Sequence, residues 1–236
     1  MLVDTTKIIN DTISVFNTPL IHKHFQSLES ISVEDYNQLH TSPLVPLNIK
    51  IDVPSFLTEI EEWLPNAQQW GKSHLHLPRK ALALVNEDGA IKENDPINGS
   101  LYEWNLNNPE NPILETNCVV PTSIMFLKSL QPLSMFDGHW CRSNLLVWEK
   151  DAEFKPHVDT LIPSYWFRLW GTTSNNIKLR FAENDQLKEH PDVEPGRIYL
   201  INTALVHDAY CKEGNGIQFF LSVLPSALKV IKELRM

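Results

Sequence analysis

The sequence has few cysteines and no long hydrophobic run, and both absences narrow the possible classes of protein. Only three of its 236 residues are cysteine and none lies in a CxxC pair, so neither a disulfide framework nor a zinc site is predicted. No apolar stretch approaches the roughly 20 residues of a membrane-spanning helix. The N-terminal MLVDTTKIINDTISVF lacks the charged start and unbroken apolar run of a signal peptide. We therefore expect a cytoplasmic protein with reduced thiols.

Basic residues are also in deficit. The chain has 20 Lys and Arg against 29 Asp and Glu, which gives a net charge of −9. An acidic surface repels phosphate groups, and this argues against nucleic acids and anionic membranes as partners. P-loop, GxGxxG and GxSxG motifs are absent, so we set aside nucleotide, dinucleotide and serine-hydrolase functions. The 42% of hydrophobic residues suffices for the core of one globular domain.

The first half of the chain predicts helices and loops with one strand. Four segments carry this prediction: helix and loop over about the first 50 residues, a strand at RKALALVN (79–86), a long surface loop over 90–116, and a helix at PTSIMFLKSL (121–130) that is capped at Thr122 and stopped by Pro132.

From about residue 141 short strand-like runs follow one another, separated by turn clusters such as EKD and KEGNG. These runs are SNLLVW, FKPHVDT, YWFRLWG, NIKLRF, GRIYLIN, ALVHDAY and IQFFLSVL. Many short strands at this spacing favour a mainly β fold with flanking helices and a jelly-roll core. We expect a single domain, 1–236, with a helical and loop part over about 1–116, the β core over about 117–225 and a closing helix at 226–236.

His157-Val158-Asp159 is the sharpest local feature. Residues two apart on a strand face the same way, so His157 and Asp159 are expected to point together into the fold. His207, in the strand-like ALVHDAY, lies far enough along the chain to come from a different strand. Two His and one carboxylate on one face of an iron leave the other face open for a cosubstrate and O₂. We therefore predict that His157, Asp159 and His207 bind a metal.

The other histidines are weaker candidates for metal ligands. His22 and His24, and likewise His74 and His76, have the same spacing but no nearby carboxylate and no strand-rich context. Exposed or structural roles are the better interpretation for both pairs. His139 and His190 are expected to be solvated or hydrogen-bonded.

The segments HVDTLIPSYWFRLWG, NIKLRFAEND and EPGRIYLINTALVHDAY resemble the aspartyl/asparaginyl β-hydroxylase family, which includes free-proline hydroxylases. The resemblance covers about residues 142–224. The order of motifs in that family is HxD, an Arg, a Gly-led strand and a distal His, and here it falls on His157 and Asp159, Arg168, Gly196 and His207. The resemblance implies a double-stranded β-helix (cupin-like) core, iron(II) as cofactor and 2-oxoglutarate as cosubstrate.

The cosubstrate-binding residues follow the family in part. The resemblance implies that Arg168 pairs with the 2-oxoglutarate carboxylate near the metal, through two parallel hydrogen bonds. A second Arg should follow His207, but the matching positions hold Ile217 and Gln218. Gln218 offers hydrogen bonds without charge, and Arg180 or Arg197 are candidates to compensate.

The predicted function is a 2-oxoglutarate-dependent dioxygenase that hydroxylates an aliphatic carbon of an amino acid or peptide residue, with O₂ and a small-molecule or peptide substrate as partners. Two alternatives stay open: a non-catalytic cupin-like metal-binding or scaffold protein, and a jelly-roll metalloenzyme that uses no 2-oxo acid. Trp104, Trp166 and Trp170 are candidates for an apolar pocket wall or for core packing. Arg142 is expected to face either the substrate or solvent.

Overall fold

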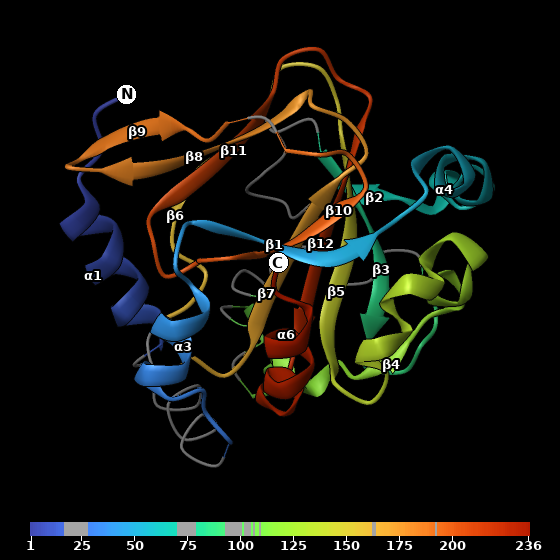
Figure 1. Ribbon diagram of the computed structural model, residues 1–236, viewed down its shortest axis with the longest axis horizontal. Coiled ribbons are helices and arrows are strands. Elements are labelled where there is room, and N and C mark those ends of the chain that lie inside the picture. Colours follow the sequence, from blue (N-terminus) through green and yellow to red (C-terminus); the bar gives the residue numbers. More distant parts are fainter. Residues whose placement is uncertain are drawn as a thin grey trace.

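The computed structural model describes residues 1–16, 28–69, 79–92, 101, 105, 107, 108, 110–161, 164–191 and 193–236. Within them the chain is mainly β: two antiparallel sheets face each other, and short helices lie around them (Figure 1). This confirms the β-rich, jelly-roll class that the run of short strands predicts.

The larger sheet has eight strands among the described residues. Its order is β1-β10-β7-β12-β5-β3-β2, and β4 also pairs with β3. In that order the strands are β1 Leu44–Lys50, β10 Arg197–Ile201, β7 Phe167–Thr172, β12 Gly216–Val223, β5 Trp140–Trp148, β3 Arg79–Asn86, β2 Gln68–Gln69 and β4 Val120–Pro121.

The smaller sheet has the order β6-β11-β8-β9. Its strands are β6 Ala152–His157, β11 His207–Cys211, β8 Ile177–Glu183 and β9 Gln186–Glu189. One register pair matters for function: His207 at the start of β11 lies opposite His157 at the end of β6. The antiparallel ladder therefore joins residues 50 positions apart in the sequence at one end of this sheet.

Helices and 3₁₀ turns occupy the periphery. They are α1 Thr5–Phe16, α3 Val33–Leu39, α4 Val53–Ile60, η1 Leu64–Asn66, η3 Glu115–Asn117, η4 Ser123–Phe126, η5 Lys128–Phe136, η6 Pro225–Ala227 and α6 Leu228–Leu234. No helix in the described part of the chain is long and apolar enough to cross a membrane.

Strand alternation gives the larger sheet two different faces. On β7, Leu169 points to the outer face and joins the main core, together with Phe56 of α4 and Ile231 of α6. Its neighbours Arg168 and Trp170 point the other way, toward the smaller sheet. The outer face is thus sealed by helices and is apolar, whereas the inner face carries the polar residues of a pocket.

Several elements differ from the sequence prediction. The first 50 residues hold the strand β1 in addition to helices, and its pairing with β10 places it in the larger sheet. The β core therefore does not begin at about residue 117, because β1 and β3 both belong to this sheet. The tetrapeptide strand β9 was not predicted either, since a strand this short leaves too few alternating residues to recognise.

The predicted helix over 121–130 is instead the two 3₁₀ segments η4 and η5. Thr122 does not cap a helix: its hydroxyl donates to the Ala83 carbonyl at 3.0 Å, which ties this residue to β3. Pro132 lies inside η5 and does not stop it. The predicted surface loop over 90–116 is not at the surface near its end, because Leu114 is buried and Glu115 lines the pocket.

Two glycines with left-handed backbone allow a test of turn strain. Gly196, at the turn into β10, has φ +83°, and a Cβ there would collide with the Ile51 carbonyl and lie 3.0 Å from Val53 Cγ2. Gly138 has φ +81°, but a Cβ there would meet nothing within 4 Å. We expect Gly138→Ala to lower the free energy of unfolding by about 1 kcal/mol through the backbone alone. Gly196→Ala should cost clearly more, and equal losses in denaturant titrations would contradict this account.

Candidate metal centre

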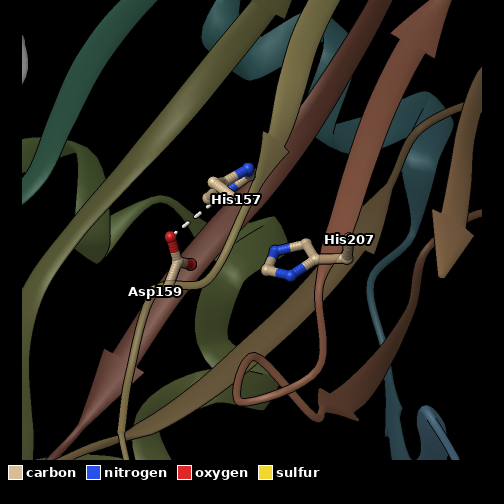
Figure 2. Close-up of side chains that lie close together, drawn as sticks. All are labelled: His157, Asp159 and His207. Atoms are coloured by element: carbon tan, nitrogen blue, oxygen red, sulfur yellow. Dashed lines mark ion pairs between the residues drawn. The ribbon is translucent and has the colours of Figure 1, made fainter. Parts of the chain in front are cut away.

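His157, Asp159 and His207 lie together at one end of the smaller sheet (Figure 2). One ligand atom from each of the three lies within 4.8 Å of the others. His157 Nε2 is 3.2 Å from Asp159 Oδ1, and the two imidazole centroids are 4.4 Å apart. Asp159 lies two residues past the end of β6, where its backbone N–H donates to the Thr203 carbonyl at 3.1 Å. The fold thus brings together the three residues that the sequence singles out.

Backbone hydrogen bonds fix how both imidazoles present their nitrogens. Nδ1 of His157 lies 2.8 Å from the Lys155 carbonyl, and Nδ1 of His207 lies 2.9 Å from the Leu205 carbonyl. A carbonyl can only accept, so each Nδ1 donates its proton to the carbonyl, and Nε2 is the nitrogen left to face a metal. Protein metal sites commonly orient their histidines in this way.

The protonation states also suit a cation. Burial, and to a smaller extent the charge of the nearby His157, lower the pKa of His207 to about 4. Burial by itself would raise the pKa of Asp159, but His157, Arg168 and His207 together hold it well below its usual range. At neutral pH this leaves a neutral imidazole and a carboxylate, which are the forms that bind metals.

The three side chains line a pocket between the two sheets, with a cavity volume of about 210 Å³. Its walls combine apolar residues, among them Leu146, Leu179 and Phe220, with charged ones. The donor set fits a divalent metal, because two imidazole nitrogens and one carboxylate on one side leave coordination positions for ligands in the pocket. The structure therefore provides a site that could hold a metal ion.

Arg168 of β7 lies beside this triad and is 4% exposed. Its Nε is 3.6 Å from Asp159 Oδ2, and its Nη1 donates to the hydroxyl of Ser222. The guanidinium also lies over the ring of Phe220, with Cζ 3.8 Å from the centroid. A buried cation thus stands next to the candidate metal ligands, as the family pattern implies.

Gln218 of β12 also lines the pocket, but Arg180 and Arg197 do not. Arg180 pairs across the smaller sheet with Asp208, at 2.8 and 2.6 Å, and points away from the triad. The cause is alternation, since Asp208 follows His207 on β11 and must face the opposite side. Arg197 lies at the start of β10, where it pairs with Glu194 at 2.6 Å. Neither arginine is placed to bind a ligand in the pocket.

Sequence reasoning missed two charged residues of the pocket. Arg79, at the start of β3, is 1% exposed, and Glu115 of η3 bonds Arg142 at 2.9 Å. Arg142 is therefore buried in the pocket wall and does not face solvent. The charged Arg79 at the head of the strand RKALALVN was a usable signal, but only the sheet order shows that its side chain meets the triad's pocket.

The other residues considered in the sequence analysis lie partly in the pocket and partly away from it. Trp170 lines the pocket, whereas Trp166 packs against Cys141 in a small separate cluster. His139 bonds Ser226, and His190 bonds the Pro191 carbonyl. All three cysteines are free and buried. His22, His24, His74, His76 and Trp104 lie outside the described residues.

No protein-family model and no curated protein matches the chain. Solved structures with a similar fold include an oxidoreductase of the 2OG-Fe(II) oxygenase family from Burkholderia pseudomallei, with 12% identity and a TM-score of 0.41 over 83% of this chain and 91% of that one. Recombinant oxalate oxidase in complex with glycolate shares 10% identity, with a TM-score of 0.33 over 66% of this chain and 55% of that one.

KdgF from Halomonas sp. has 11% identity and a TM-score of 0.27 over 35% of this chain and 67% of that one. The chain thus spans about half the length of the oxalate oxidase and two thirds of KdgF. At such scores and identities these likenesses carry no argument about chemistry, which has to come from the side chains of the site.

The metal site makes a direct prediction. His157→Ala, Asp159→Ala and His207→Ala should each weaken iron(II) binding on the order of 100-fold or more, because even loss of a supporting hydrogen bond costs about 10–100-fold. His190→Ala, which removes a half-buried imidazole that does not line the pocket, should leave the affinity unchanged. Anaerobic titration of iron(II) measures all four, and circular dichroism checks that they fold. Equal affinity in wild type and His207→Ala would refute the site.

Proposed function

We propose that this protein is an iron(II)- and 2-oxoglutarate-dependent dioxygenase that hydroxylates an aliphatic carbon of an amino acid or peptide residue. The observation that carries the proposal is the set of two imidazole nitrogens and one carboxylate oxygen, within 4.8 Å of one another, on the wall of a pocket that also holds buried arginines. A metal bound by three protein ligands on one side keeps positions open for a chelating cosubstrate and O₂.

When bound, iron(II) supplies the oxygen chemistry: O₂ oxidatively decarboxylates 2-oxoglutarate to succinate and CO₂, with one oxygen atom entering succinate and the other replacing a substrate C–H with C–OH. The chain's own residues have different tasks. They hold the metal, orient the 2-oxo acid and substrate, and keep the reacting atoms in a largely apolar pocket.

The charge of the pocket favours an anionic ligand. Three arginines, Arg79, Arg142 and Arg168, line it, against only two carboxylates, those of Glu115 and Asp159. A divalent metal would add further positive charge, in a protein whose net charge is −9. Burying uncompensated charge is costly, so a dianion such as 2-oxoglutarate would offset this excess. The alternative hypothesis, a non-catalytic scaffold protein, gives no reason for such a concentration of buried cations.

Arg168 is the group best placed for the carboxylate next to the metal. Its Nε faces Asp159, a candidate metal ligand, at 3.6 Å. Its position against Ser222 and over the Phe220 ring holds the planar fork in one orientation. A fixed guanidinium can pair with a carboxylate through two parallel bonds, which a lysine cannot do.

The substrate side of the proposal draws on Glu115 and Arg142. Arg142 Nη1 is 2.9 Å from Glu115 Oε1, and Glu115 Oε2 lies 3.5 Å from Arg168 Nη1. A carboxylate and a guanidinium side by side match the ammonium and carboxylate groups of an amino acid. Because only a free amino acid carries both groups on one carbon, this pairing supports a free amino acid as the substrate.

Arg168 allows a test of cosubstrate binding. Arg168→Ala should weaken 2-oxoglutarate binding to the iron(II)-loaded protein by roughly 1.5–3 kcal/mol, about one to two decades in affinity. Arg168→Lys should recover little of it. Anaerobic calorimetry measures both, with Arg197→Ala as the control because Arg197 pairs with Glu194 away from the pocket. Unchanged affinity in Arg168→Ala would mean that the oxo acid binds elsewhere.

Turnover tests the reaction itself. Iron(II)-loaded protein with 2-oxoglutarate, O₂ and a panel of amino acids and short peptides should form succinate together with a product heavier by one oxygen atom. Mass spectrometry follows both products, and Asp159→Ala is the inactive control. If succinate formed at the same slow rate with and without every panel member, the amino-acid assignment would fail. If no succinate formed at all, the proposed dioxygenase function would be wrong. The protein would then be a non-catalytic scaffold or a metalloenzyme that uses no oxo acid.

A further inference from the structure

The far end of the pocket, away from Arg168, holds an uncharged polar side chain at a position where the family that the sequence resembles has an arginine. Gln218 of β12 lines this end, and its Oε1 accepts a hydrogen bond from Trp148 Nε1 at 2.9 Å. Since its oxygen is engaged, its amide NH₂ is the part that can donate to a ligand. Gln218 contributes hydrogen bonds here but no charge.

A cation reaches the same region from a different strand. Arg79 begins β3, and its register partner on β5 is Trp148, the residue bonded to Gln218. Arg79 Cζ lies 5.0 Å from the Trp148 ring centroid and 4.0 Å from that of Phe154. The guanidinium is therefore held between two aromatic rings, next to Gln218 and on the wall of the pocket.

Phe154 also fixes how far Arg79 lies from the metal site. The Phe154 centroid is 4.1 Å from the His157 ring centroid and 4.0 Å from Arg79 Cζ, so Arg79 lies within about 8 Å of that imidazole. Arg168 lies at the other end of the pocket, where it contacts Asp159. The candidate metal site thus has one buried arginine beside it and a second one a short carbon chain away.

We propose that Arg79, together with the amide of Gln218, binds the far carboxylate of the 2-oxo acid and so makes the site selective for dicarboxylic over monocarboxylic 2-oxo acids. This inference rests on the proposed function, because it concerns a ligand that chelates the metal at its oxo-acid end. It assigns to a β3 residue the cation that the position after His207 does not supply.

Burial and charge support the assignment. Arg79 is 1% exposed, and burial lowers its pKa to about 9, although the charge of Asp159 partly opposes this. A guanidinium this deeply buried gains from any anion brought beside it, since in a low-dielectric pocket a charge-assisted pair is strong.

The test compares two acids that differ only at the far end. 2-Oxoglutarate and 2-oxopentanoate have the same five-carbon chain, but the second lacks the far carboxylate. In iron(II)-loaded, anaerobic wild-type protein, calorimetry should show at least about 10-fold tighter binding of 2-oxoglutarate. Arg79→Met should weaken 2-oxoglutarate binding about 10- to 100-fold and leave 2-oxopentanoate unchanged. The tryptophan fluorescence of the protein, to which Trp148 beside the pocket contributes, provides a second readout of binding.

Two further variants keep the test decisive. Arg79→Met combined with Gln218→Arg moves the cation to β12 and should restore the preference for 2-oxoglutarate. Arg79→Lys keeps the buried charge in case Arg79→Met does not fold, and should weaken only the dicarboxylic acid. Arg197→Met is the matched control, since it removes an arginine that lies outside the pocket and pairs with Glu194.

The outcomes separate this inference from the proposed function. If the wild type bound both acids equally, or if Arg79→Met and Arg79→Lys kept the full preference, the role of Arg79 would be overturned while an oxo-acid site remained. If neither acid bound although iron(II) did, the proposed function would fail and this inference with it. Equal weakening of both acids by Arg79→Lys would show a structural role and would also overturn it.

Discussion

The register of a single strand pair governs this site. Because His207 lies opposite His157 in the antiparallel ladder of β6 and β11, two imidazoles distant in the sequence face each other at one end of the smaller sheet. A slip of one residue would turn His207 outward and bring Asp208 inward. The bidentate pairing of Asp208 with Arg180 on the opposite face opposes that slip. An ion pair that takes no part in the pocket thereby helps to hold the metal ligands in place.

The larger sheet buries three arginine side chains on its inner face. Its outer face is covered by apolar residues of the helices, so the arginines of the inner face can turn only toward the pocket. Each of the three is held by a defined neighbour: Arg142 by Glu115, Arg168 by Ser222 and the Phe220 ring, and Arg79 by two aromatic rings. Buried cations are costly unless they meet anions, which is the physical reason to expect anionic ligands here.

Much of the fold and the centre of the site were accessible from the sequence. Alternation and turn clusters predicted the strands from Trp140 onward except the short β9, because those strands are regular and have apolar inner or outer faces. The triad was also predicted as a group, although only His157 and His207 lie in strands. Asp159 lies beyond the end of β6, where the hydrogen bond from its backbone N–H to the Thr203 carbonyl holds it in place. Strand β1 was not predicted because apolar and polar residues alternate only weakly in its VPL and NIK segments. The predicted helix over 121–130 was wrong because the hydrogen bonding of Thr122 to β3 outweighed the local helix propensity.

The sequence analysis proposed Arg180 as a ligand-binding residue and overlooked Arg79, and these two errors have different causes. The outward direction of Arg180 follows from its strand, because Ile177, Leu179 and Phe181 take the inner positions and leave Arg180 the outer ones. The role of Arg79 depends instead on sheet order, which no local pattern contains. Strands β3 and β12 pair with opposite sides of β5, so they lie roughly 10 Å apart. Arginine is long enough to cover much of that gap, and a cation absent from β12 can therefore be supplied from β3 without changing the order of the sheet.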